Sequence, residues 1–414
     1  MKMIKNNSAV KADTTSDLWE KMNKLTVGEC FFQIRNGANI KQGVADGGFP
    51  ITRIETIAND RFNRDRMGYA GITDADKYQS YILEDGDLLM SHINSVQYLG
   101  RTVLYHKEEN EKIIHGMNLL AMKANRDILN PAYAQYYFRS IPFREQIRQI
   151  TKKSVNQASF TVSDLKKLPM QVPSLLEQCN AVETLDRVNK LLELHQHQLQ
   201  KLDELIKARF VEMFGDPLLD DGRYCKAPLG CLAQVGSSKR IFEKEYVSEG
   251  IPFYRTKEIV ELSNGNKIST ELFITPKRYN EIRDEYGVPQ AGDLLISAVG
   301  TIGVIWIVDG KNDFYFKDGN LLRVANSDNF MPVYLKCLLE TLICAHKSKM
   351  SSGTAYAALT ISTLKEMSVY KVPLAEQSQF STFVSQVDKS KVAVQKSLDE
   401  AQHLFDCLMQ EYFS

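Results

Sequence analysis

The chain has 414 residues, which is long for one domain and predicts two or more. Hydrophobic residues make up 43% of the sequence, as in an ordinary soluble globular protein, and no run of about eighteen apolar residues predicts a membrane span. The formal net charge is zero, so charge alone does not indicate nucleic-acid binding, and seven scattered cysteines without a CxxC pair are typical of reduced thiols in the cytoplasm.

The first part of the chain predicts a polar tail followed by a globular domain. Residues 1–20 are polar and lack the apolar core of a signal peptide. Over residues 21–173, the apolar runs FFQI, DLLMS and RTVLYH are broken by Gly, Asn and Asp, which is typical of strands and turns. A helix is expected to begin at Asn130-Pro131, because proline in the first helical turn costs no hydrogen bond. The polar loop KKSVNQASFT follows this helix.

Residues 174–214 predict one long helix. The extended dipeptide Val172-Pro173 ends the domain, and Glu177 suits the positive end of the helix dipole. No Gly or Pro interrupts the chain from Leu175 to Phe214. Such a helix spans roughly 60 Å, which is too long to pack on its own domain alone. Apolar residues recur with the 3-4 spacing of a coiled-coil seam at Leu185, Val188, Leu192, Leu199, Leu202 and Ile206.

The second part repeats this order, with a globular domain over residues 215–373 and a long helix over residues 374–414. Its strand-like runs are DLLISAV and GVIWIV, its helix begins at Met331-Pro332, and its polar loop reads KMSSGTAYAALT. Val372-Pro373 then precedes the last helix. The predicted seam of that helix includes Val387, Val394, Leu398, Phe405 and Leu408.

Short matches between the two parts indicate a tandem duplication. The matches keep the same order, while the offset drifts from 206 to 199 residues as small loop insertions would cause. They are Gly48-Phe49-Pro50 with Gly250-Ile251-Pro252, Arg53 with Arg255, Gly86-Asp87-Leu88-Leu89 with Gly292-Asp293-Leu294-Leu295, Asn118-Leu119-Leu120 with Asn320-Leu321-Leu322, and Thr161-Val162-Ser163 with Thr360-Ile361-Ser362.

The two long helices are expected to pair. A globular domain separates them along the chain, so each can run antiparallel to the other, with two heads held apart by a double rod in a nearly two-fold arrangement. The alternative is that each helix packs only on its own globular core.

The helical segments are acidic, with net charges of −3 each over residues 171–216 and 373–414, whereas residues 1–170 carry +5. Ordinary solvated surface explains such small charges equally well.

No segment predicts a catalytic centre. Asn130-Pro131-Ala132-Tyr133 is similar to the adenine-gripping loop of DNA amino-methyltransferases, but alanine replaces the second proline and the matching segment at 331–334 has no Asn. The shared feature is a helix start. Gly300-Thr301-Ile302-Gly303 is too short for a dinucleotide fingerprint, and the seven histidines do not cluster as metal ligands would.

The whole arrangement resembles the specificity subunit of Type I restriction–modification enzymes. The likeness rests on LPMQVPSLLEQ with its following helix, on GDLLIS followed by GTIG, and on SSGTAYAALTISTLK. The first half departs from it, with Ser91-His92-Ile93-Asn94 in place of SAVGTIG. The resemblance implies an α+β fold with two tandem α/β target-recognition domains, separated by two long helices that form an antiparallel coiled coil with internal pseudo-two-fold symmetry.

The resemblance also implies a function and partners. Each recognition domain would read one half of a bipartite site in double-stranded DNA, and the coiled coil would set the gap. Two methyltransferase subunits would dock on the helices and restriction subunits would join them. The chain itself would hold no cofactor or metal, with S-adenosylmethionine, ATP and Mg expected on the partner subunits.

Base reading and phosphate contact use Arg, Lys, Asn, Gln, Ser and Thr, which the polar loops supply. Arg53 and Arg255 are the foremost candidates, because they occupy matching places after Gly-x-Pro. The candidates in the first domain are Arg35, Asn36, Arg53, Arg64, Arg66, Asn94, Lys152, Lys153, Asn156 and Gln157. Those in the second are Ser237, Ser238, Lys239, Arg240, Arg255, Lys257, Lys349, Ser351, Ser352 and Thr354.

Two other hypotheses compete with a DNA-specificity subunit. A methyltransferase fused to its own target domains is disfavoured, because the duplication uses the whole chain. A non-enzymatic coiled-coil adaptor that binds protein partners without DNA is the remaining alternative. Neighbouring genes for a methyltransferase and a large helicase-like nuclease would separate these classes.

Overall fold

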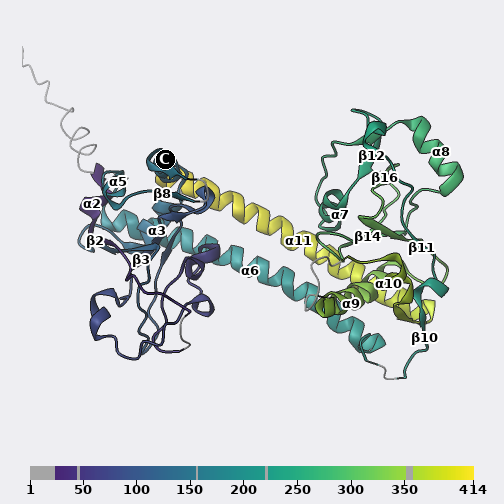
Figure 1. Ribbon diagram of the computed structural model, residues 1–414, viewed down its shortest axis with the longest axis horizontal. Coiled ribbons are helices and arrows are strands. Elements are labelled where there is room, and N and C mark those ends of the chain that lie inside the picture. The colour runs from purple at the N-terminus through teal and green to yellow at the C-terminus, as the bar shows by residue number, and fades with distance from the viewer. Residues whose placement is uncertain (1–23, 44–46, 155–156, 220–221, 351–357) are drawn as a thin grey trace, which may run out of the picture. The chain divides into compact units, whose positions relative to one another are not determined.

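The computed structural model describes residues 24–43, 47–154, 157–219, 222–350 and 358–414 (Figure 1). The chain divides into two compact units. Unit 1 contains the residues up to Leu194 together with Ser397–Ser414, and unit 2 contains His195–Lys396. Each unit therefore includes one globular domain and parts of both long helices. None of the helices in the described part of the chain is both long and apolar enough to cross a membrane.

Unit 1 is built on a four-stranded antiparallel sheet. Strand β3 lies inside this sheet and all four of its residues are buried, which explains why its sequence LLMS is apolar rather than alternating. Its hydroxyl residue, Ser91, is buried as well. The strand order is β2 (Phe31–Asn36), β6 (Leu119–Ala124), β3 (Leu88–Ser91) and β5 (Thr102–Leu104).

Short strands and helices complete unit 1 (Figure 1). Two small sheets join β1 (Lys24–Thr26) to β9 (Pro169–Gln171), and β4 (Ile93–Asn94) through β8 (Ala158–Ser159) to β7 (Lys152–Lys153). The α-helices are α2 (Val27–Cys30), α3 (Pro131–Arg139), α4 (Ile141–Ile150) and α5 (Val162–Lys166). The 3-10 helices are η1 (Ile54–Asp60), η2 (Arg64–Arg66), η3 (Asp76–Tyr81) and η4 (Val96–Tyr98).

Unit 2 contains a sheet of the same strand order. It runs β11 (Val235–Gly236), β17 (Leu321–Val324), β14 (Leu294–Ser297) and β15 (Ile305–Ile307). A second sheet, β13 (Phe273–Ile274), β12 (Ile251–Tyr254) and β16 (Tyr315–Phe316), includes a parallel pair of β12 with β16. Strand β10 (Lys226–Pro228) pairs with β18 (Ser368–Tyr370). The helices are η5 (Leu229–Cys231), η6 (Glu243–Glu245), α7 (Thr256–Ser263), α8 (Pro276–Tyr286), α9 (Pro332–Met350) and α10 (Ile361–Glu366).

The duplication predicted from the sequence is confirmed by matching local geometry in the two units. The repeated Gly-Asp-Leu-Leu motif forms the same turn before β3 and β14. The Asp87 carboxylate accepts the amide of Glu84 at 2.9 Å, and the Asp293 carboxylate accepts the amide of Gln290 at 2.8 Å. Both aspartates are buried, so each turn is fixed by a satisfied buried carboxylate.

The predicted helix starts at the two prolines are also confirmed. Pro131 and Pro332 open α3 and α9, and the Asn130 side chain caps α3 by accepting the amide of Ala132 at 2.9 Å. Tyr133 is buried and its ring centroid lies 5.2 Å from that of Phe413. The segment that is similar to a methyltransferase loop therefore serves as a helix start and a core contact.

The two long helices, α6 (Leu175–Phe214) and α11 (Leu374–Phe413), pack together in an antiparallel sense. In unit 1, Leu185 near the start of α6 shares a core with Phe405 and Tyr412 near the end of α11. In unit 2, Phe210 near the end of α6 lies 5.4 Å, between ring centroids, from Phe380 near the start of α11. Within the same unit, Lys391 of α11 pairs with Asp203 of α6 at 2.7 Å.

Burial along these helices follows the seam positions. Three leucines off the seam of α6, Leu191, Leu194 and Leu205, are exposed. The seam positions are all buried or half-buried: Leu185, Val188, Leu192, Leu199, Leu202, Ile206, Val387, Val394, Leu398, Phe405 and Leu408. The 3-4 spacing therefore separates covered from uncovered apolar residues on helices that are not uniformly apolar.

Candidate nucleic-acid interface

A small sheet in unit 1 gathers four candidate residues that the sequence separates by about sixty positions. Asn94 in β4 faces Ala158 in β8, and Lys153 in β7 faces the same alanine from the other side. Lys152 and Lys153 are exposed, and neither ammonium has an ion-pair partner among the described residues. Gln157 follows at the turn, where its carbonyl accepts the Ser154 amide at 2.8 Å. Asn94, Lys152, Lys153 and Gln157 thus lie on or beside one small sheet, which we call the hairpin surface. The Asn94 amide is engaged locally, because it donates to the Ser91 hydroxyl at 3.3 Å and accepts the Ser95 amide at 2.8 Å.

A second group in unit 1 lies around the end of strand β2. The Arg35 guanidinium stacks on the Tyr81 ring, 4.2 Å from its centroid, and Asn36 is exposed at the end of the strand. Arg53 is half-exposed, and its only ion pair among the described residues is a 3.5 Å contact with Glu55, which is itself 55% exposed. An exposed pair of this kind contributes little, so Arg53 is available to bind an anion.

Arg64 has a structural role that the sequence did not reveal. Its guanidinium binds both carboxylate oxygens of Glu111 at 2.9 Å and a carboxylate oxygen of Glu108 at 3.1 Å. The hydrogen bond from Arg64 holds the pKa of Glu111 below its usual range, although burial opposes this shift. Arg66, by contrast, is exposed and has no ion-pair partner within the described segments.

In unit 2, the candidates after β11 are partly engaged in the fold. The Ser237 hydroxyl donates to the Leu321 carbonyl at 2.8 Å, and the Ser238 hydroxyl is buried without a hydrogen-bond partner in the described structure. Arg240 pairs with Asp318 at 2.8 Å but remains 67% exposed. The Lys239 ammonium lies 4.6 Å from the centroid of the Tyr286 ring. Lys239 and Arg240 therefore supply the charge of this loop.

Arg255 is the counter-ion of a buried carboxylate. Glu258 is only 1% exposed, and its carboxylate accepts the Arg255 amide at 2.8 Å and the Arg255 guanidinium at 3.1 Å. The hydrogen bond to Glu258 raises the pKa of the guanidinium. Lys257 is exposed and has no ion pair in the part of unit 2 that is described. The side chains of the candidates Asn156, Lys349, Ser351, Ser352 and Thr354 lie outside the described residues.

Three arginines of unit 1 that the sequence patterns did not single out lie near one another. The Arg101 guanidinium binds the Asp60 carboxylate at 3.2 Å, and the Arg139 guanidinium donates to the Asp60 carbonyl at 2.7 Å. Arg101 and the exposed Arg144 both lower the pKa of Arg139, though less than its burial does. No local sequence signal joins residues about forty positions apart, so only the fold reveals this cationic cluster.

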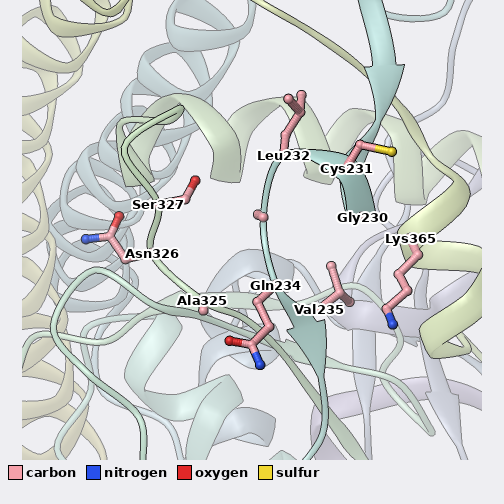
Figure 2. A pocket seen from close by; sticks show the side chains of 10 residues that line it. Gly230, Cys231, Leu232, Gln234, Val235, Ala325, Asn326, Ser327 and Lys365 are labelled. Atoms are coloured by element: carbon pink, nitrogen blue, oxygen red, sulfur yellow. The ribbon is translucent and has the colours of Figure 1, made fainter.

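Unit 2 also has an open hollow of about 620 Å³, shown in Figure 2. Its lining comes from residues 230–235, from residues 325–327 and from Lys365 of α10. These side chains include no acid–base pair, and no group of three His, Cys, Asp or Glu within the described residues could hold a metal ion. The hollow therefore has the chemistry of a polar surface depression.

Comparison with known proteins agrees with this architecture. The family model for the Type I restriction modification DNA specificity domain matches residues 20–204 and 226–401. A protein described as the MjaX specificity subunit of a type I restriction enzyme from Methanocaldococcus jannaschii is 26% identical over 401 residues, covering 90% of this chain and 89% of that protein. The EcoKI specificity subunit of Escherichia coli is 23% identical over 166 residues, covering 40% of this chain and 35% of that protein.

Two solved structures share the fold. The Type I restriction–modification S subunit from M. genitalium has a TM-score of 0.52 at 16% identity and 98% coverage of both chains. A chain from a structure concerned with complex assembly and conformational transition of the type I restriction–modification system has a TM-score of 0.56 at 17% identity, covering 94% of this chain and 97% of that one. With both halves matched by the family model, the chain belongs to the family of type I restriction–modification specificity subunits.

Proposed function

We propose that this chain gives a type I restriction–modification complex its DNA sequence specificity without performing chemistry itself. The recognition domains, residues 21–173 and 215–373, each read one half of a bipartite site in double-stranded DNA. The helices, residues 174–214 and 374–414, set the gap between the half-sites and dock two methyltransferase subunits, which restriction subunits then join in the cytoplasm. S-adenosylmethionine, ATP and Mg bind to those partners.

The hairpin surface supports this proposal most directly. A DNA reader needs cations that are free to bind phosphates, and side-chain amides that both donate to and accept from base edges. Lys152 and Lys153 supply exposed cations without ion pairs among the described residues, and the exposed Gln157 beside β8 supplies an amide. The Asn94 amide would have to exchange its bonds to Ser91 and Ser95 for bonds to a base. An adaptor that bound only protein would have no need for this combination.

The test of the proposal uses the purified chain with and without its methyltransferase partner. Labelled S-adenosylmethionine and duplex DNA should give labelled DNA only when the partner is present, because the hollow and the loops described above hold no catalytic constellation. Mapping of the methylated bases should then return a bipartite site. Labelled DNA from the chain alone would overturn the non-catalytic assignment, and a complex without sequence preference would favour the adaptor.

A further inference from the structure

One buried glutamine joins three segments at the start of α6. Gln178 is completely buried, and its side-chain amide donates to the Ile128 carbonyl at 2.8 Å and to the Pro173 carbonyl at 2.7 Å. Its side-chain carbonyl accepts the Asn130 amide at 2.8 Å. The first turn of the long helix is thus tied to the turn before α3 and to the Val-Pro segment that leaves the domain.

Gln377 makes the same three bonds at the start of α11. It is completely buried, and its amide donates to the Asn329 carbonyl at 3.0 Å and to the Val372 carbonyl at 2.8 Å. Its side-chain carbonyl accepts the Met331 amide at 2.7 Å. The two halves therefore share this arrangement bond for bond, although only scattered residues are identical between them.

The neighbouring glutamate does not share such a role. Glu177 accepts the amide and the hydroxyl of Ser174, as in a capping box, whereas Glu376 accepts the hydroxyl of Tyr224 at 2.5 Å. A repeated Glu-Gln pair in which only the glutamine keeps its partners indicates that the glutamine performs the shared task.

Apolar packing between a domain and a helix stabilises contact but tolerates small rotations, because it is not directional. A buried amide with two donated bonds and one accepted bond restricts the arrangement more narrowly, since a rotation large enough to break one of these bonds leaves a buried polar group unpaired. For a protein that reads two half-sites at once, the angle of each domain on its helix decides how far apart the half-sites can be.

We infer that Gln178 and Gln377 are positioning residues that fix the orientation of each recognition domain on its long helix, and so restrict the complex to a single gap length. This inference rests on the proposed function. It concerns the angle at which each domain meets the DNA and leaves the choice of bases to the polar loops.

The test compares Gln178→Met and Gln377→Met with the unchanged chain, each co-produced with the methyltransferase partner, by sequencing the methylated bases of the host genome. Methionine keeps the length of the side chain and removes all three hydrogen bonds. Both half-sites should remain recognised, while methylation at gaps one base pair longer or shorter should rise about tenfold, because each of the three lost hydrogen bonds contributes a modest net stabilisation to the fixed orientation. The matched control is Gln196→Met, because Gln196 is exposed on α6.

A second substitution covers the case in which a methionine variant fails to fold. Gln178→Glu keeps the shape and the acceptor for Asn130, but its second oxygen faces the Ile128 and Pro173 carbonyls and can donate to at most one of them, when the carboxyl group is protonated. It should therefore also broaden the gap. A folded variant with the original single gap, or with methylation lost at every gap, would overturn the inference. If the unchanged complex shows no bipartite site, the proposed function fails instead.

Discussion

At the scale of single residues, the two halves use one inherited position differently. Arg53 and Arg255 both precede a helical turn, and their own amides donate to residues three positions on, Thr56 and Glu258. Arg255 also neutralises the buried Glu258, whereas Arg53 meets only the exposed Glu55. Arg53 and Arg255 therefore look equivalent in the sequence, but only Arg255 is expected to contribute substantially to folding stability.

We predict that Arg255→Ala lowers the stability of unit 2 by about 1–3 kcal/mol, because it leaves Glu258 buried without its partner. If Arg255 also contacts DNA, affinity falls by about 1–3 kcal/mol for a base contact, or the salt slope falls by about one for a phosphate contact. Arg255→Ala combined with Glu258→Gln separates the two effects, because it removes the stranded charge. Denaturant unfolding and DNA binding at several salt concentrations measure both, and Arg53→Ala serves as the comparison. Unchanged stability of Arg255→Ala would contradict the structural role.

Two buried histidines, His92 and His115, are expected to make the stability of unit 1 sensitive to acid. Burial lowers the pKa of His92 to about 4, and burial together with Arg35 lowers that of His115 to about 3. Both imidazoles are neutral in the folded and unfolded states well above the ordinary histidine pKa of about 6.5. Below that value the unfolded chain binds protons that the folded chain does not, so stability falls as the pH drops toward about 4.

The residue that matches His92 in the second half is Ala298, which suggests the test. His92→Ala should lower stability at every pH, because it leaves a cavity beside Phe160, and it should remove up to about 3 kcal/mol of the further loss between about pH 6.5 and 4. Hydrogen exchange of the β3 amides across this range reports on unit 1. An acid sensitivity equal to that of the unchanged chain would contradict the assignment.

At the scale of elements, the repeat and the seam spacing made most of the fold predictable. Apolar runs, helix-starting prolines and matched offsets are local signals, and they identified the main strands, α3, α9 and both long helices. The candidate DNA-binding residues were harder to predict from the sequence. Strands β4, β7 and β8 have two residues each, too few for a periodic pattern, and the bond between Arg64 and Glu111 spans 47 positions. Long-range partners decide which cations are free.

The hairpin formed by β7 and β8 should act as one element in DNA binding. Lys152→Ala with Lys153→Ala should reduce the salt slope of binding by about two and weaken all sequences alike, as expected for two phosphate contacts. Stability should stay within about 0.5 kcal/mol, because both side chains are exposed. Lys389→Ala on α11, also exposed, is the matched control. A salt slope that matches the control would exclude the hairpin from the DNA contact.

At the scale of the whole molecule, the helix pair is expected to act as a ruler. Inserting four residues near Gln200 and four near Val394 adds about one turn, roughly 6 Å, to both helices and keeps the seam nearly in phase. Since duplex DNA rises about 3.4 Å per base pair, the complex should read the same half-sites with a gap about two base pairs wider. Sequencing of methylated bases measures the gap. A folded, active variant with the original gap would refute the ruler, and insertion in α6 alone is the control for disturbed pairing.

The small two-stranded sheets affect how such a chain can evolve by exchange of segments. Strand β1, which opens the first domain, pairs with β9, which closes it, and β10 pairs with β18 in the second. The chain therefore enters and leaves each domain at neighbouring strands. The rest of the domain is, in effect, a segment inserted between two adjacent points of the backbone. If recombination exchanges the segment between the two paired strands, the first and last strands of the domain still lie side by side next to the long helix. Under the proposed function, a new half-site specificity can therefore be acquired by exchanging one segment, while the long helices and the small sheets stay the same.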